Sequence, residues 1–478
     1  MKRFIPHTLL LAAALLTGGV RATAQMKTAY FMEGSVQRLD LNAALVPQRG
    51  YAAIPGMGNV GVEANSNFLS VRNFLYPAPD GDGLVTFLHG SVGNREFLRR
   101  MRRNNHLEIN VRENLLGFGG YARRYFWSFG LNLRSESSIN LPKDLFSLLK
   151  RLEPGQYDLK GTDITSDNYL EMAMGFAFPI RILTKEVTIG FRAKGLLGLA
   201  HASVHIDGMD IDLNDREWRA DLRGSVNANV AGMNFSDLRG RIELQDVMDR
   251  LDPSDIDLNR IGSWGLAFDL GAETRFLDDR LKVSLGLNDL GFVCWSKKCG
   301  VGGTLSDLSF AYSGYDFDRE ELSTSTPDEI MLDIAPARNR TRMLKATLNV
   351  GGEYNILDER IGFGLLWQTR FASSFTSTEL TASANFRPSP WFTASLSHSL
   401  LQNRLGVFGF ALNVHPSWIN FFLGMDYIGL RYGKYSDIAT IPIGMKAINL
   451  HFGLSVPITK PKADGFKAAT RARLHRRR

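Results

Sequence analysis

The strongest constraint on this chain is a strict alternation of apolar and polar residues near its C-terminus. From Ile448 to Val456, every even-numbered residue is apolar and every odd-numbered residue is polar or glycine. Successive side chains of a β-strand point to opposite faces, so a period of two predicts a strand with one apolar and one polar face. Segments of about ten such residues, separated by turns, are typical of β-barrels that span a membrane.

Other segments of the chain resemble this one, and together they predict the fold class. The fourteen candidate strands are 58–71, 106–119, 124–138, 168–182, 186–204, 262–277, 281–295, 340–357, 360–373, 378–387, 391–401, 404–414, 418–430 and 444–457. We therefore expect an all-β fold, an antiparallel transmembrane β-barrel of about fourteen strands that occupies residues 58–458.

The connections between these strands alternate in length. Short turns such as Arg123-Arg124 and Asp278-Asp279 alternate with long loops. Outer-membrane barrels have short periplasmic turns and longer outer loops. The long outer loops are predicted at 72–105, 139–167, 205–261 and 296–339, with both ends of the barrel in the periplasm.

Several segments inside the long loops have patterns of their own. Residues 216–233 alternate, which indicates either an arm that extends the barrel wall or a misplaced neighbouring strand. Helical spacing at 142–152 and 244–251, and a basic run at 94–103, predict short helices that cap the outer mouth. The basic run is either a solvated face or a site for acidic outer-leaflet sugars.

The two ends of the chain carry further signals. A basic start, a short apolar run and Ala22-Thr23-Ala24 predict a signal peptide, residues 1–24, that is cleaved after Ala24. The basic tail at 459–478 contributes strongly to the net charge of +7. This tail either has no role or binds anionic lipid headgroups or an acidic partner, and export excludes nucleic acid.

One hairpin carries a family resemblance. The first strand contains Trp264-Gly265 with Asp269 and Gly271, and the second ends in Asn288-Asp289-Leu290-Gly291. This pair resembles the hairpin of the FadL-like outer-membrane proteins, a superfamily that includes the Bacteroidetes protein PorV. From about residue 30 to 458 the chain resembles the Bacteroidetes barrels of the DUF5723 family within it.

The resemblance implies a plug and a function. FadL-like barrels have fourteen strands and an N-terminal plug, and they move hydrophobic molecules such as fatty acids inward from the outer surface. Asn42-Ala43-Ala44 is similar to the Asn-Pro-Ala motif of that plug, with Ala43 in place of proline. Residues 25–57 are therefore expected to form a periplasmic plug.

Two function classes follow, and an enzyme is not expected. The first is passive uptake or binding of a hydrophobic small molecule, with Leu145, Phe146, Leu148 and Leu149 as its capture surface. The second is a barrel that does not transport but scaffolds a secretion-system or surface protein, as PorV-like proteins do. No Ser/His/Asp arrangement indicates catalysis, and no cofactor is expected. Outer-membrane lipid and lipopolysaccharide are the expected surroundings.

The remaining candidate sites are weak. His201 and His205 are about 13 Å apart on one strand face, which is too far to share a metal ion. No metal site is therefore expected. Cys294 and Cys299 are close enough in sequence for a small loop disulfide in an oxidising compartment, and the alternative is two free thiols.

Overall fold

The structure is a computed structural model that describes most of residues 26–458. The positions that it does not describe within this span are 80–82, 152–156, 214–217, 244–256, 258–261, 306–314, 317–320, 323–330, 336–337, 372–375, 402–403, 430–431, 435–439 and 443–446. The predicted signal peptide, the basic tail and the expected helix at 244–251 lie outside the described residues.

The described strands form a closed antiparallel barrel with fourteen wall positions. One position is shared by β1 (Tyr51–Ala53) and β2 (Val60–Ser66). The other thirteen are β5 (Asn104–Ala122), β6 (Tyr125–Pro142), β7 (Thr162–Ile182), β8 (Lys185–Leu213), β11 (Trp264–Phe276), β12 (Leu281–Trp295), β18 (Ala346–Ile356), β19 (Ile361–Phe371), β20 (Thr376–Ser389), β21 (Phe392–Leu401), β22 (Arg404–Val414), β23 (Asn420–Gly429) and β26 (Ala447–Pro457).

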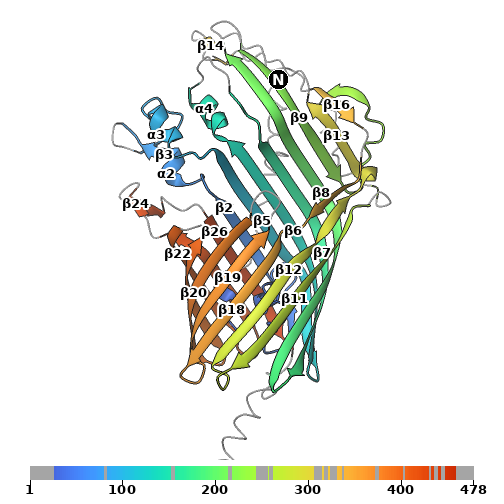
Figure 1. Ribbon diagram of the computed structural model, residues 1–478, viewed down its shortest axis with the longest axis vertical. Helices are drawn as coiled ribbons and strands as arrows, with labels where there is room; N and C mark the ends of the chain where they lie inside the picture. Colours follow the sequence, from blue (N-terminus) through green and yellow to red (C-terminus); the bar gives the residue numbers. More distant parts are fainter. Residues whose placement is uncertain are drawn as a thin grey trace, which may run out of the picture.

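The barrel closes where the last strand meets the first wall position. Strand β26 pairs with β23 on one side and with both β1 and β2 on the other. Strands β1 and β2 in turn pair with β5. Within the described residues, every neighbour around the ring is thus antiparallel and hydrogen-bonded, which leaves no open edge in the ring (Figure 1).

The predicted all-β barrel of about fourteen strands is confirmed, with local corrections. The candidate strand 340–357 is two strands, β17 (Arg340–Met343) and β18, because pairing with β12 is interrupted at Leu344. Residues 51–53, assigned to the plug from the sequence, belong to the wall as β1. Strand β8 continues to Leu213, well past its predicted end at 204.

A sheet extends the wall beyond the ring at the end that carries the long loops, called here the long-loop end (Figure 1). The predicted arm at 216–233 forms β9 (Trp218–Val230), which pairs with the upper part of β8. Strand β9 then pairs with β13 (Gly300–Leu305), β13 with β16 (Met331–Ala335), and β16 with β10 (Gly240–Glu243).

The described helices are short. They are α2 (Val71–Phe74), α3 (Asn94–Leu98), α4 (Lys143–Arg151), η1 (Lys27–Ala29), η2 (Val36–Asp40) and η5 (Lys297–Cys299). Three small hairpins complete the elements: β3 (Leu75–Pro77) with β4 (Leu84–Thr86), β14 (Tyr315–Asp316) with β15 (Glu321–Leu322), and β24 (Tyr432–Lys434) with β25 (Thr440–Pro442).

Helices α2, α3 and α4 share an apolar core with the β3–β4 hairpin at the long-loop end. We call this unit the cap. Its buried side chains include Phe68, Phe97 and Phe146, and the rings of Phe68 and Phe146 lie 5.3 Å apart. The predicted helix at 142–152 is present as α4, and the basic run at 94–103 contains only the short helix α3.

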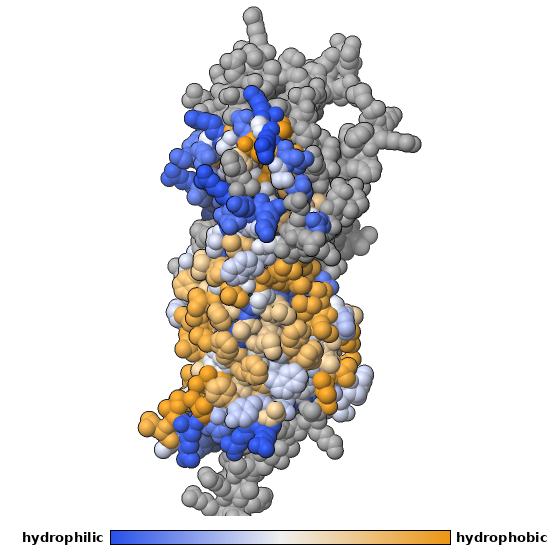
Figure 2. Space-filling view, turned by 90° about the vertical axis from the view of Figure 1, so that its right-hand side faces the viewer, coloured by the Kyte–Doolittle hydropathy of each residue, from blue (hydrophilic) through white to orange (hydrophobic). Residues whose placement is uncertain are grey.

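The two faces of the wall are the reverse of those in a soluble protein. On β11, Trp264, Leu266, Phe268 and Leu270 point outward and are 42–51% exposed, whereas Asp269 between them is fully buried in the lumen. Apolar side chains outside and polar side chains inside are what a barrel in lipid requires. Figure 2 shows a hydrophobic band across the face in view, with hydrophilic surface above and below it.

Aromatic side chains mark the lower margin of the band, at the end of the short turns. Tyr125, Trp391 and Trp418 lie next to these turns and are 50–70% exposed. Tyr and Trp prefer the membrane–water interface. None of the described helices is long and apolar enough to cross a bilayer.

The outward face of β11 provides a test of this orientation. We expect Leu270→Arg to lower the free energy of unfolding in lipid by about 2–4 kcal/mol, because it places a charge in hydrocarbon. Leu88→Arg, at a residue of the cap that is already 55% exposed, is the control and should change it by less than about 0.5 kcal/mol. Urea titration in phospholipid vesicles measures both, and equal effects would contradict the orientation.

Candidate functional site

Residues 26–50 lie inside the barrel ring, where they close the lumen, and we call them the plug. They contain η1 and η2, and almost all of their side chains are buried. The apolar side chains Met26, Tyr30, Phe31, Leu41 and Leu45 belong to one buried cluster, to which the wall adds Leu366, Ala411 and Phe422. A second cluster joins Leu39 of the plug to Tyr51, Phe126 and Ala177 of the wall. The plug therefore has a small apolar core and one apolar contact surface with the wall.

Glycines in the wall make room for the plug. A Cβ atom at Gly271 would lie 2.0 Å from Asn42 Oδ1, and one at Gly190 would lie 2.1 Å from the carbonyl of Ala43. Contacts this short are impossible, so only glycine fits at these two positions. The Asn42-Ala43-Ala44 motif is thus seated directly against β8 and β11, and Asn42 Nδ2 also donates to the Leu285 carbonyl oxygen at 3.0 Å.

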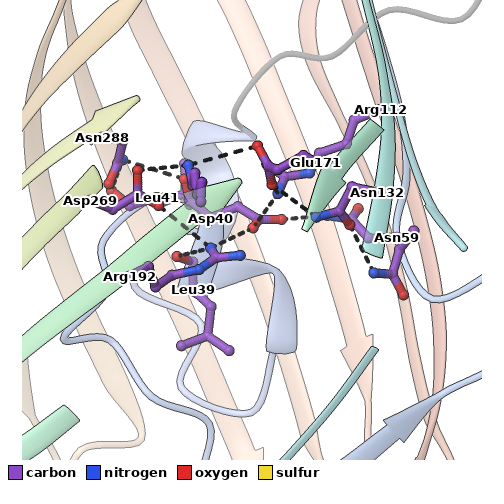
Figure 3. Close-up of polar contacts among 12 residues, drawn as sticks. Leu39, Asp40, Leu41, Asn59, Arg112, Asn132, Glu171, Arg192, Asp269 and Asn288 are labelled. Carbon is purple, nitrogen blue, oxygen red and sulfur yellow. Dashed lines mark hydrogen bonds and ion pairs between the residues drawn. The ribbon is translucent and has the colours of Figure 1, made fainter. Parts of the chain in front are cut away.

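Asp40 of the plug lies between two arginines of the wall. Its Oδ1 atom is 2.9 Å from Arg112 Nη2 on β5 and 2.9 Å from Arg192 Nη1 on β8 (Figure 3). Arg192 also donates to the Leu39 carbonyl oxygen at 3.0 Å, and Asn59 donates to Asp40 Oδ2 at 2.8 Å. One carboxylate therefore joins the plug to three separate parts of the wall.

The two arginines belong to a larger network of buried ion pairs in the wall. Glu171 Oε1 accepts from Arg112 and Glu171 Oε2 accepts from Arg134, at 2.9 and 2.7 Å. Lys194 Nζ lies 2.6 Å from both Asp269 and Asp289. The central network is defined here as Asp40, Arg112, Arg134, Glu171, Arg192, Lys194, Asp269 and Asp289. Each member has a partner of opposite charge within 4 Å, which offsets the cost of burying the charges.

A β-bulge brings a fourth carboxylate into this network. Asn288 and Asp289 of β12 both oppose Asp269 of β11, where the register shifts. Asp289 has a φ of 57°, and its backbone N–H donates to Asp269 Oδ1 at 2.8 Å. Because of the bulge, both residues face the lumen, and Asn288 Nδ2 donates to the Leu41 carbonyl oxygen of the plug at 2.6 Å.

Two further sets of polar contacts hold the plug. Glu33 pairs with Lys282 of β12 and lies 3.5 Å from Arg275 of β11. At the start of the plug, Lys27 pairs with Glu379 of β20, and the Lys27 backbone N–H donates to Asp426 of β23 at 3.0 Å. The plug is thus attached to strands on opposite sides of the ring, mainly through charged groups.

The plug carboxyls are ionised at neutral pH. Burial raises the pKa of Asp40, but Arg112 and Arg192 lower it further, so that it lies below its ordinary value. Burial likewise raises the pKa of Glu33, and Lys282 and Arg275 bring it well below its ordinary value. Both side chains therefore keep the charge that their partners on the wall require.

The space left beside the plug is small and polar. A cavity of about 40 Å³ lies between the plug and the wall, and its lining includes Asp40, Arg112, Arg134 and Asp289. A second cavity of about 40 Å³ lies against the other side of Asp40, and its lining includes Leu39, Tyr51 and Arg192. Each of these volumes holds a few water molecules.

Comparison with family models decides the family. Residues 43–426 match the model described as "Family of unknown function (DUF5723)". The chain belongs to the DUF5723 family. The match includes the Asn42-to-Ala44 motif from Ala43 onward and the whole β11–β12 hairpin, the two parts of the chain that meet where the plug is seated.

Solved structures that this chain resembles include a toluene transporter and a hydrocarbon channel. The toluene transporter TbuX of Ralstonia pickettii is 9% identical, with 93% of this DUF5723 chain and 97% of that chain covered and a TM-score of 0.42. The monoaromatic hydrocarbon channel CymD is 10% identical, with 94% and 97% covered and a TM-score of 0.37. The fold assignment rests on the strand pairing described above. The search of curated proteins finds no match.

The hairpin residues singled out in the sequence have physical roles in this DUF5723 barrel. Asp269, Gly271 and Asn288 face the plug, as described above. Trp264 and Leu290 are 51% and 47% exposed on the outer face. Gly265 and Gly291 pass close to the neighbouring strand, where a Cβ would lie 2.2 and 2.1 Å from a carbonyl oxygen.

The remaining candidates from the sequence are the apolar residues of α4 and the two cysteines, and they differ in burial. In α4, Phe146 is buried in the cap core, Leu145 and Leu148 are half-buried, and Leu149 is 44% exposed. The disulfide considered for Cys294 and Cys299 is not formed. Cys294 pairs in register with the outward-facing Trp264, whereas Cys299 lies inward beside Ser263 and Asn229, so the two thiols point to opposite faces.

Sequence reasoning missed the charged half of this site. Asp40 and its partners Arg112, Glu171, Arg192 and Lys194 were not singled out. A signal was present, because charged residues at inward positions of alternating strands must be paired if they are buried. The partners themselves lie far apart along the chain and become neighbours only through the barrel.

The glycine contacts give one prediction. Gly271→Ala should lower the free energy of unfolding by about 1–3 kcal/mol, since the added methyl group displaces Asn42. Gly352→Ala in β18 is the matched control, because a Cβ there meets no atom within 4 Å. If urea titration gives the same value for both variants, the close seating of the plug is wrong.

The Asp40 carboxylate gives a second prediction. Asp40→Asn should cost about 3 kcal/mol at pH 7, because it removes the carboxylate that lies 2.9 Å from two buried arginines. The folded pKa of Asp40 is below the unfolded one, so its contribution is present above about pH 4 and is lost as the pH falls through the folded pKa. The variant should therefore lose less stability on acidification than the parent protein.

Glu96→Gln is the control for this prediction, because Glu96 belongs to an exposed ion pair with Arg100. It should change the free energy of unfolding by less than about 1 kcal/mol. Urea titrations between pH 3 and 7 measure all three proteins, and parallel pH curves for the parent and Asp40→Asn would contradict the role of Asp40.

Proposed function

We propose that this protein is an outer-membrane barrel for passive uptake of a hydrophobic small molecule, and that the plug is its gate. The observation that carries the proposal is the set of ion pairs between plug and wall. Lys27, Glu33 and Asp40 of the plug each pair with a charged residue of the wall, in addition to the apolar contacts that the plug makes.

A polar contact of this kind suits an element that moves. When charged groups separate, water hydrates both of them again, whereas separated apolar surfaces stay exposed at a cost that scales with their area. A permanent filler would gain more from apolar packing, because buried ion pairs are often no more stabilising than apolar side chains of the same size. The charges therefore favour a plug that leaves its seat and returns to it.

Capture would take place at the cap. Leu149 is exposed on α4, Leu145 and Leu148 are half-buried beside it, and Leu88 is 55% exposed in the same unit. We propose these side chains as the first contact of the hydrophobic molecule, with Phe146 supporting them from the core of the cap. In this account residues 1–24 direct export, and lipopolysaccharide and outer-membrane lipid surround the band.

A second function has an observation of its own. The sheet of β9, β13, β16 and β10 continues the wall far beyond the ring, and the lumen beside the plug holds only a few water molecules. A closed barrel with an elevated sheet suits a scaffold for a secretion-system or surface protein. In that case the plug would be a fixed part of the wall.

A reversible lock on the plug tests the first function against the second. Thr28 Oγ1 of the plug lies 2.5 Å from Ser397 Oγ on β21, so cysteines at both positions can form a disulfide. In a background with Cys294 and Cys299 replaced by serine, the lock should reduce uptake of radiolabelled oleate at least tenfold. The host is a Gram-negative strain without its own fatty-acid channel, and a reductant should restore uptake.

The matched control links two wall strands and leaves the plug free. Ser137 Oγ on β6 lies 3.0 Å from Ser166 Oγ on β7, and cysteines at these positions should not change uptake. If oleate uptake is equal with and without the disulfide between plug and wall, the proposal that the plug is a gate is wrong. Absence of uptake together with co-purification of one large partner complex would favour the scaffold instead.

A further inference from the structure

A small cavity at the long-loop end has no part in the contacts of the plug. It lies where β12 ends at Trp295, between the upper part of β8 and strands β9, β13 and β17. Its lining includes His201, Trp295, Arg338, Arg340 and backbone atoms of Gly300–Gly302. About 10 Å³ of it is free, which is room for one group the size of a water molecule.

The cavity contains a buried hydrogen-bond donor without a partner. Trp295 is 1% exposed, and its Nε1 atom has no hydrogen-bond partner among the described residues. The indole ring stacks on His201, with 5.2 Å between the ring centroids and 25° between the planes. Buried donors are almost always paired in folded proteins, so the unpaired indole N–H of a residue that lines a cavity indicates a missing acceptor.

Two arginines at the same cavity have no carboxylate partner among the described residues. Arg338 is exposed and Arg340 is half-buried, and burial lowers the pKa of Arg340. Arg342, two residues further along β17, is different because it lies 3.4 Å from Asp167. The arginines of the lumen differ from these two in the same way, since Arg112, Arg134 and Arg192 all contact carboxylates.

The carboxylate that contacts His201 is already engaged by a second residue. Asp167 Oδ1 lies 2.7 Å from His201 Nδ1, and Asp167 Oδ2 lies 3.4 Å from Arg342 Nη1. The contact with Asp167 also holds the imidazole in place against Trp295. Among the described residues, Arg338 and Arg340 therefore leave an excess of positive charge beside Trp295.

We propose that this cavity binds an oxyanion, either a carboxylate or a phosphate group. Arginine guanidinium groups suit both, because their fork of N–H donors matches the two oxygens. The Trp295 N–H supplies a third donor from within the wall. The free volume admits one oxygen atom of the anion, and the rest of the anion lies outside the cavity beside the guanidinium groups. The proposal does not depend on movement of the plug.

Calorimetric titration of the purified full-length protein in neutral detergent tests the site. Inorganic phosphate and acetate are the probes. We expect the parent protein to bind at least one of them, and the double variant Arg338→Gln/Arg340→Gln to bind it at least tenfold more weakly. Trp295→Phe keeps the ring but removes the N–H, and it should weaken binding severalfold.

Arg241→Gln, on β10 of the same extended sheet, is the control and should bind as the parent does. The proposal is overturned if the parent binds neither probe, or if the double variant binds as well as the parent. Since Arg338 is exposed, Arg338→Gln alone is expected to fold and provides a second variant whose binding must also weaken.

A lipid probe identifies the source of the anion. Lysophosphatidic acid in neutral micelles presents the same phosphate on an amphiphile. Tighter binding of this lipid than of inorganic phosphate supports a lipid headgroup at the site, and equal binding supports a free anion. Either result supports an oxyanion site in this cavity. Because binding is measured with the plug in place, it is independent of whether oleate uptake succeeds or fails.

Discussion

The structure depends on charge pairing across the boundary between plug and wall. A barrel with an apolar outer face must place its polar residues inside, and in a closed lumen their charges have little water to solvate them. Asp40 between Arg112 and Arg192, and Glu33 beside Lys282, meet this requirement. The wall also supplies carboxylates to these cations, such as Glu171 for Arg112 and Glu359 for Lys282, and the plug adds the remaining ones.

This dependence explains the short motifs that the sequence carries. Asn42 to Ala44 can enter the wall only where Gly190 and Gly271 leave space. The bulge at Asn288 and Asp289 supplies an amide for the plug backbone and a carboxylate for Lys194. The β11–β12 hairpin is therefore both a part of the barrel wall and the seat of the plug, which accounts for its unusual content of Gly, Asn and Asp.

Much of the fold could be predicted from the sequence, because a period of two in residues such as 281–295 is a local property of the chain. The partners in the lumen could not be predicted, since Asp40 and Arg192 are 152 positions apart and meet only when the ring closes. The disulfide considered for Cys294 and Cys299 is absent for a similar reason, because the turn after Trp295 places Cys299 inward, away from Cys294. Burial of Phe146 depends on the cap core, to which distant residues contribute.

If the plug is a gate, it leaves its seat as a separate unit while the wall stays intact. Hydrogen exchange of backbone amides, followed by mass spectrometry, measures this. We expect residues 26–46 to exchange together, faster than the amides of β11 and β12, and Asp40→Asn to speed exchange in the plug but not in the wall. Plug amides as slow as those of the wall, in both proteins, would contradict it.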